Sequence, residues 1–181
     1  PGKPIRLVLG FPPGGISDVL ARAIGAKLYT AMGQQVLVDN RAGAGTTIAS
    51  DLVAKSPPDG YTLFMQDITT HAINASLYRK LPYDPIRDFT PVALVATTPL
   101  MLLVHPSLPV KSLKELVALA KSRPGQIVYA SSGNGTILHL STERLKSMAG
   151  IDMVHVPYKG SGQAVQALLG GEVAVSFSTM P

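Results

Sequence analysis

The sequence predicts an α/β protein with two lobes, each built on a mainly parallel sheet. Short apolar runs alternate with segments of helical periodicity along the whole chain, which is the order that builds parallel sheets. Polar or glycine-rich loops follow these runs, at the sheet edge where such folds bind ligands. A connector with two prolines, residues 81–89, and a break at residues 97–99 interrupt the alternation. We therefore expect lobe 1 to span residues 1–98 and lobe 2 to span residues 99–181.

Lobe 1 is expected to alternate strand and helix. Residues 5–10 form an apolar run typical of a buried strand, and a helix is expected over 16–32 because apolar residues recur there on one stripe. Gly33 supplies the stop for this helix. Asp18 lies in its first turn, where a carboxylate suits the helix dipole. The other expected elements are strands at 36–40 and 61–66, a short helix ending at Ala54, a helix at 71–78 and a strand at 91–96.

Lobe 2 repeats the pattern. A helix is expected over 113–122, since Ser112 and Glu115 form a capping box. The other expected elements are strands at 100–105, 127–130, 153–156 and 173–177, a helix at 137–149, and a helix ending at Gly170-Gly171. Ser178 and Thr179 are expected to follow the last strand. Because the sequence stops after this strand, near Phe177, we expect it to be truncated.

The first corner, residues 11–18, joins a strand to a helix N-terminus through Pro12-Pro13-Gly14-Gly15. A helix N-terminus directs unpaired backbone N–H groups and a positive dipole end at one spot, and glycines let a ligand approach the backbone closely. A similar polar corner, residues 131–136, opens a helix of lobe 2 and is called the second corner below. Each is an anion-binding candidate, although most such corners are only turns.

Composition excludes several classes of protein. The chain has 181 residues, of which 46% are hydrophobic and 15% charged, so it can bury a core and is not of a disordered type. Without cysteine it has no disulfide, no Cys-based zinc site and no thiol nucleophile. The net charge of +5 comes from scattered residues, which disfavours nucleic-acid binding and favours small anions. No apolar run approaches the length of a membrane span, and the sequence shows no signal-peptide pattern.

Enzyme motifs are weak or absent, so we predict no catalytic residue, metal site or cofactor. Gly43 and Gly45 follow a strand, and Asp67 lies 67 − 45 = 22 residues on, as in a dinucleotide fingerprint, but Ile48 replaces the third glycine. There is no Walker A motif, HExxH motif or nucleophile elbow. A dinucleotide-dependent enzyme is kept only as a distant alternative.

Three side chains near the corners keep more than one interpretation each. His139, in the first turn of its helix, either donates to a bound carboxylate or packs. Tyr158 either closes over a ligand or packs. Asp67 either binds an amino group, orders water, or caps the segment that follows it.

The ordered set of corner motifs resembles the Bug family, the solute-binding receptors of tripartite tricarboxylate transporters. The similarity runs over essentially the whole chain, and the order and spacing of its motifs are specific. The matching segments are KPIRLV (3–8), FPPGG (11–15) with Asp18, NRAGAG (40–45), PDGYTL (58–63), LYRKLPYDP (77–85), YASSGNG (129–135), HL (139–140), VPYKG (156–160) and LLGG (168–171).

The resemblance implies a type II periplasmic-binding-protein fold, in which two α/β lobes close on a solute like a flytrap. It implies a small carboxylate ligand (a di- or tricarboxylate, an acidic amino acid or an aromatic acid) held partly through ordered waters. Family members commonly carry Asp-Asn where this chain has Ser178-Thr179, which puts a preference for amino groups in doubt. Carried over, the ligand-binding residues are Phe11, Pro13, Gly14, Gly15, Asp18, Gln66, Asp67, Thr69, Ser131, Ser132, Gly133, Thr136, His139, Tyr158, Gly160 and Ser178.

The resemblance also implies a periplasmic location and a role without chemistry. The expected partners are the membrane subunits of a transporter, and we expect a monomer that binds no nucleic acid. The alternative is a ligand-sensing module that serves a signalling or regulatory partner such as a sensor protein.

Overall fold

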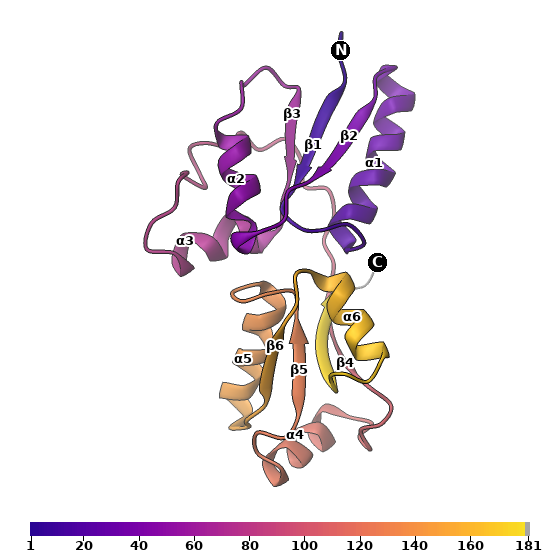
Figure 1. Ribbon diagram of the computed structural model, residues 1–181, viewed down its shortest axis with the longest axis vertical. Coiled ribbons are helices and arrows are strands. Elements are labelled where there is room, and N and C mark those ends of the chain that lie inside the picture. The colour runs from indigo at the N-terminus through magenta and orange to yellow at the C-terminus, as the bar shows by residue number, and fades with distance from the viewer. Residues whose placement is uncertain (180–181) are drawn as a thin grey trace. The chain divides into compact units, whose positions relative to one another are not determined.

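The chain folds as two units in the computed structural model, which describes residues 1–179 (Figure 1). The first unit is Pro1–Thr97, and the second begins at Thr98. Each unit carries its own sheet and its own hydrophobic core.

The sheet of the first unit is parallel, with strand order β2-β1-β3. The helix α1 spans the 17 residues that its apolar periodicity predicts, and Gly33 ends it in a left-handed conformation, as expected of a glycine stop. Its elements are β1 (Ile5–Leu9), α1 (Ile16–Met32), β2 (Val36–Asn40), a 3-10 turn (Ala44–Thr46), α2 (Thr47–Ala54), β3 (Thr62–Met65), a π-helical turn (Thr69–Ile73) and α3 (Asn74–Leu77).

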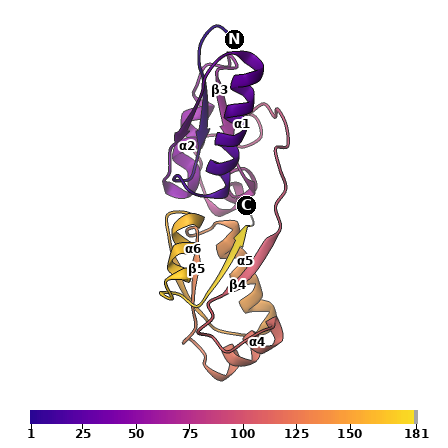
Figure 2. The ribbon, with the colours of Figure 1, turned by 90° about the vertical axis from the view of Figure 1, so that its right-hand side faces the viewer.

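Helices α1 and α2 cover opposite faces of this sheet (Figure 2). On one face, Leu7 and Leu9 of β1 pack with Ala21 of α1. On the other face, Val8 and the α2 residue Ala49 are both fully buried. Because β1 is central and covered on both sides, its carboxyl end, where the first corner begins, is held rigidly.

Gly10, directly after β1, leaves no room for a side chain. A Cβ atom there would lie 2.7 Å from Cβ of Thr46, which is 1% exposed and has a left-handed φ of 77°. We therefore expect Gly10→Ala to lower the free energy of unfolding by about 1–3 kcal/mol, since overpacking forces buried atoms apart. Urea denaturation followed by circular dichroism measures this change.

Gly25 in the middle of α1 provides the matched control. A Cβ atom there would meet Cβ of Val36 at 3.4 Å, an ordinary contact. Gly25→Ala should be neutral or stabilising, because alanine favours a helix interior over glycine by about 1 kcal/mol. Equal losses in Gly10→Ala and Gly25→Ala would contradict the packing argument.

The sheet of the second unit has strand order β4-β7-β5-β6. Strand β5 is parallel to β6 and β7, whereas β4 runs antiparallel to β7. Its elements are β4 (Leu100–Val104), α4 (Leu113–Ser122), β5 (Val128–Ser131), α5 (Ile137–Ala149), β6 (Val154–Pro157), α6 (Ser161–Leu169) and β7 (Val175–Thr179). The capping box is confirmed in part: Ser112 Oγ accepts from the Glu115 amide at 3.3 Å, whereas Glu115 Oε2 accepts from Lys111 rather than Ser112.

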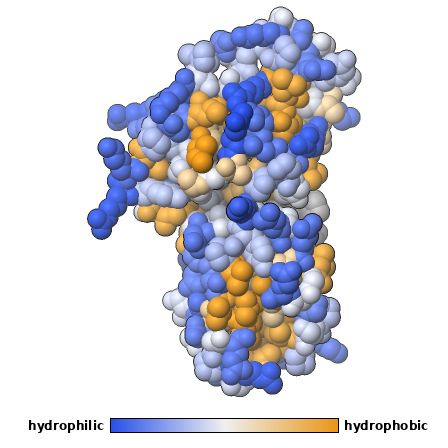
Figure 3. Space-filling model, viewed as in Figure 1, coloured by the Kyte–Doolittle hydropathy of each residue, from blue (hydrophilic) through white to orange (hydrophobic). Residues whose placement is uncertain are grey.

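The core of the second unit has two layers. On one face of the sheet, Tyr129 of β5 and Met153 pack against Leu116 and Ala120 of α4. On the other face, Ala130 packs against α6. Hydrophobic residues gather over the strands on the side shown in Figure 3. Strand β5 is therefore buried on both faces, as β1 is in the first unit.

Two expectations about the elements are wrong. Residues 91–96 form no strand: this segment is extended without ladder partners, and Val92 and Leu94 are each 83% exposed. Conversely, Ser178 and Thr179 do not follow the last strand but belong to β7, where Ser178 lies opposite Met101 and is buried. None of the helices in the described part of the chain combines the length and apolar character needed to cross a membrane.

Candidate functional site

Asp18 fastens the first corner to the sheet. Its carboxylate accepts hydrogen bonds from the Gly14 amide (3.1 Å), from Nδ2 of Asn40 (3.2 Å) and from Nε and Nη2 of Arg22 (3.1 and 3.0 Å). Asn40 also donates to the carbonyl of Phe11 at 3.0 Å. The hydrogen bond from Arg22 and those from Gly14 and Asn40 hold the pKa of Asp18 below its usual value, against the effect of burial. Its carboxylate is therefore occupied within the corner itself.

The first corner presents backbone N–H groups. The amides of Gly15, Ile16 and Ser17 have no acceptor among residues 1–179. They lie at the N-terminus of a 17-residue helix, where the dipole favours a negative charge. Pro13 and Gly14 are exposed, and a Cβ atom on Gly14, whose φ is +90°, would meet nothing within 4 Å. An anion can therefore reach the first corner, where uncharged backbone N–H groups would bind it.

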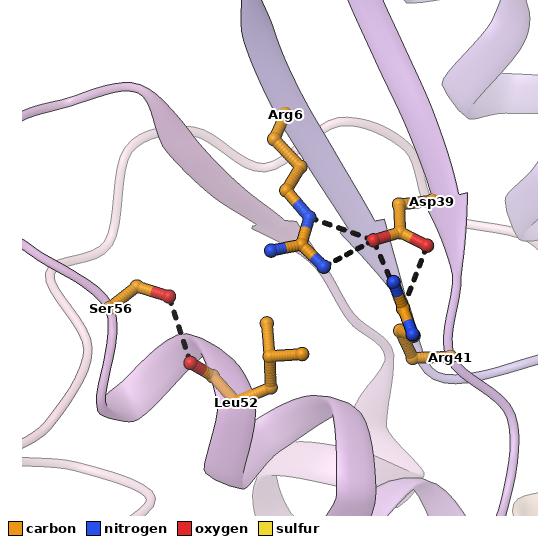
Figure 4. Close-up of polar contacts among 5 residues, drawn as sticks. All are labelled: Arg6, Asp39, Arg41, Leu52 and Ser56. Atoms are coloured by element: carbon orange, nitrogen blue, oxygen red, sulfur yellow. Dashed lines mark hydrogen bonds and ion pairs between the residues drawn. The ribbon is translucent and has the colours of Figure 1, made fainter.

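Three arginines of the first unit, Arg6, Arg22 and Arg41, are paired with carboxylates. Figure 4 shows the guanidinium groups of Arg6 and Arg41 converging on Asp39 from either side. The Nε atoms of Arg6 and Arg41 lie 2.7 and 2.9 Å from its oxygens, and Arg22 is bound to Asp18. These pairs compensate much of the positive charge near the first corner, so the N–H groups of the backbone carry its anion-binding capacity.

The residues that follow β3 are hydrogen-bonded to one another. Oδ1 of Asp67 accepts from the amides of Thr69 (2.9 Å) and Thr70 (3.3 Å), so Asp67 caps the π-helical turn, one of its three expected roles. Burial raises the pKa of Asp67, although these amides act the other way. Nε2 of Gln66 lies 2.9 Å from Nδ1 of His71, and Thr69 is buried.

The second corner uses its hydroxyl groups internally. Ser132 Oγ donates to Thr136 Oγ1 at 3.0 Å, and Thr136 Oγ1 donates to the carbonyl of Gly133 at 2.8 Å. Ser131 Oγ lies 3.2 Å from both the carbonyl and the amide of Gly133. All three hydroxyl-bearing residues are buried. The structure thus brings Ser131, Ser132 and Thr136 together, and their hydroxyl groups donate hydrogen bonds within the loop.

His139 joins this corner through its ring. Its Nδ1 accepts from the Gly135 amide at 3.1 Å, and Nε2 has no partner among residues 1–179. In the first turn of α5, the amides of Leu138 and His139 likewise have no acceptor in this part of the chain. Neutral N–H groups therefore gather here as they do at the first corner.

The remaining predicted residues of the second unit have structural contacts. The ring of Tyr158 packs against the hydrophobic cluster under α6, and its hydroxyl lies 3.4 Å from Oε2 of Glu172. Of the two interpretations of Tyr158, the structure therefore shows packing. Gly160 is buried as the N-cap of α6. The hydroxyl of Ser178 donates to the carbonyl of Thr179 at 3.3 Å.

Asn40 and His155 lie in the candidate site but were not predicted from the sequence pattern. Asn40 binds both Asp18 and Phe11, and His155 Nε2 lies 2.7 Å from Ser131 Oγ. A signal was present for each: Asn40 is a polar residue at the carboxyl end of a strand, and His155 interrupts the apolar run of β6.

Comparison with known proteins identifies the family. The family model described as "Tripartite tricarboxylate transporter family receptor" matches residues 20–181. The chain belongs to this family. It is a family of receptors rather than enzymes, which removes the dinucleotide-dependent enzyme as an alternative.

Curated relatives agree with this assignment. The chain is 43% identical over 182 residues to Protein BugT of Bordetella pertussis, covering 100% of this chain and 56% of the relative. It is 43% identical over 180 residues to a protein of Pseudomonas sp. strain P51 from the tcbD-tcbE intergenic region, covering 99% and 53%. The chain thus spans little more than half the length of these relatives.

Solved structures confirm the periplasmic-binding-protein fold. The structure of R. palustris Rpa4515 with adipate matches with a TM-score of 0.96 and 42% identity, covering 100% of this chain and 60% of that one. MatC from Rhodopseudomonas palustris with bound malate gives 0.91 and 35%, covering 99% and 61%. Periplasmic binding protein BugD gives 0.92 and 31%, covering 99% and 60%.

Proposed function

We propose that the protein is a periplasmic receptor that captures a small carboxylate and delivers it, as a monomer, to a tripartite tricarboxylate-type transporter. The observation that carries this proposal is the first corner, where the amides of Gly15, Ile16 and Ser17 lack acceptors at the start of α1. Adipate and malate, which accompany two similar proteins, are both dicarboxylates.

Each corner has the chemistry of a carboxylate site. Amides at a helix N-terminus bind an anionic oxygen without the desolvation cost of a buried cation. The second corner adds the amides of Leu138 and His139. Ordered waters are expected to satisfy the remaining carboxylate lone pairs. We propose that the sixteen residues named from the family resemblance line the solute site. Among them, Asp18, Asp67, Ser131, Ser132 and Thr136 act mainly by shaping their loops.

Calorimetry on the intact protein with adipate, malate, citrate, aspartate and benzoate tests this function. Gly14→Val should weaken binding of the best solute about 100-fold, or about 3 kcal/mol, because a β-branched residue at φ +90° is strained and the corner must move. Binding of none of these acids would contradict the proposed function.

Gly60→Val is the matched control for Gly14→Val. Gly60 also has a left-handed φ, +79°, and a Cβ atom there would likewise meet nothing within 4 Å. It lies before β3, at the end of the sheet away from the first corner. The two variants should lose similar stability, yet only Gly14→Val should lose affinity. Equal affinities would show that the first corner does not bind the solute.

A sensor protein as partner is the second candidate. Delivery to a transporter is favoured by the description of the family model, which names a transporter receptor. A pull-down from membranes with and without the solute distinguishes the two partners.

A further inference from the structure

Three rings from different elements of the second unit are stacked beside the second corner. The His155 ring of β6 lies between Tyr129 of β5, at a centroid distance of 4.8 Å and 17° between planes, and His139 of α5, at 4.1 Å and 15°. Tyr129 and His155 are direct neighbours in the register of β5 and β6. The position and tilt of the His139 ring are thus set by a layer of aromatic groups.

Hydrogen bonds at the loop fix this layer further. The Gly135 amide donates to Nδ1 of His139 at 3.1 Å, and Nε2 of His155 lies 2.7 Å from Ser131 Oγ. A backbone amide is only a donor, so Nδ1 of His139 must carry the lone pair. The proton of neutral His139 then lies on Nε2, the nitrogen that has no partner among residues 1–179.

Burial favours the neutral form of both histidines, and the charged groups around the stack only modify this effect. Glu143 and Lys146 of α5 face it: Glu143 Oε1 accepts from the Tyr129 hydroxyl at 2.6 Å and from Lys146 at 2.9 Å. The Lys146 ammonium also lies 5.7 Å from the Tyr129 ring centroid. Burial lowers the pKa of His139 and that of His155, the latter to about 4, and Glu143 opposes this only in part.

We propose that His155 and the Gly135 amide lock His139 in its Nε2–H tautomer, so that His139 offers the solute one neutral N–H donor and His155 acts as a positioning residue. The donor role rests on the proposed function, whereas the tautomer lock does not. A protonated His139 would turn an Nδ1–H group toward the Gly135 N–H, and two facing donors would open the corner. The corner is therefore intact only while His139 is neutral.

Nitrogen-15 NMR of the histidine rings tests the lock directly. In the ligand-free intact protein at pH 7, two-bond correlation spectra should show the His139 proton on Nε2 and a lone pair on Nδ1. A proton on Nδ1, or the averaged shifts of two exchanging tautomers, would overturn the inference.

Two substitutions of His139 separate its two nitrogens. H139N keeps an acceptor near the Nδ1 position, so Gly135 amide exchange should stay protected while affinity for the best carboxylate falls about 10-fold. H139Q keeps a donor near the Nε2 position but loses the anchor, so Gly135 protection should be lost. Full affinity in H139N would overturn the donor role.

Two substitutions of His155 test its positioning role. H155F keeps a stacked ring and should preserve the His139 tautomer and stay within about threefold of the original affinity. H155A removes the ring and should give exchanging tautomers and about 10-fold weaker binding. H105F, which removes a histidine outside the stack, should change neither. An unchanged tautomer and affinity in folded H155A would contradict the proposal, whereas failure of the parent protein to bind any carboxylate contradicts only the proposed function.

Discussion

Replacing Asp18 with alanine is expected to lower the free energy of unfolding of the first unit by about 3 kcal/mol. The Asp18 side chain is 7% exposed, and its removal leaves the Gly14 amide and Nδ2 of Asn40 without their acceptor. A donor that loses its partner costs about 1–3 kcal/mol when it is buried. These two hydrogen bonds are partly buried, so the two losses together give about 3 kcal/mol. Urea denaturation, followed through NMR signals of β1 and β2, measures the loss.

Arg22→Ala is the control for Asp18→Ala. The Arg22 side chain is 57% exposed, so its ion pair with Asp18 is screened by water and Arg22→Ala should cost much less stability than Asp18→Ala. Asp18→Asn is informative as well: its amide keeps one acceptor oxygen for Gly14 and should recover part of the loss. If Arg22→Ala were as destabilising as Asp18→Ala, the contacts to Gly14 and Asn40 would contribute nothing.

The local pattern of the sequence predicts most elements because the forces involved are local. Helix α1 begins and ends as predicted, since its apolar stripe, its first-turn carboxylate and Gly33 all act within a few residues. The strand expected at 91–96 fails for the opposite reason. An apolar run shows that a segment can join a sheet, whereas a strand also needs a hydrogen-bonding neighbour, and residues 91–96 have none among the described residues.

In the candidate site too, features set by neighbouring residues were predicted, whereas features set by strand pairing were not. The first and second corners were found because proline, glycine and hydroxyl residues mark a strand-to-helix turn locally. The partner of Asp18 was not found, because Asn40 lies 22 residues away and reaches the corner only through the pairing of β1 with β2. His155 was missed likewise, since its place between Tyr129 and His139 depends on the register of β5 and β6.

Protonation of His155 alone is expected to destabilise the second unit between pH 6.5 and about pH 4 by up to about 1.4 kcal/mol per pH unit. Burial holds the pKa of His155 at about 4, whereas an unfolded histidine has a pKa of about 6.5. Between these values the unfolded chain binds one more proton than the folded unit, so stability is complete above pH 6.5 and falls as the pH drops. Urea melts of β5 and β6 amide signals at several pH values give the slope.

H155F isolates this proton, because phenylalanine can stack between Tyr129 and His139 but cannot titrate. Its slope between pH 6.5 and 4 should be smaller than that of the parent protein, leaving the contribution of His139, whose pKa burial also lowers. Burial raises the pKa of Asp67, so this group favours the folded state as the pH falls, but it belongs to the first unit. An equal slope in H155F would show that His155 is protonated in the folded unit and would remove the electrostatic basis of a neutral stack.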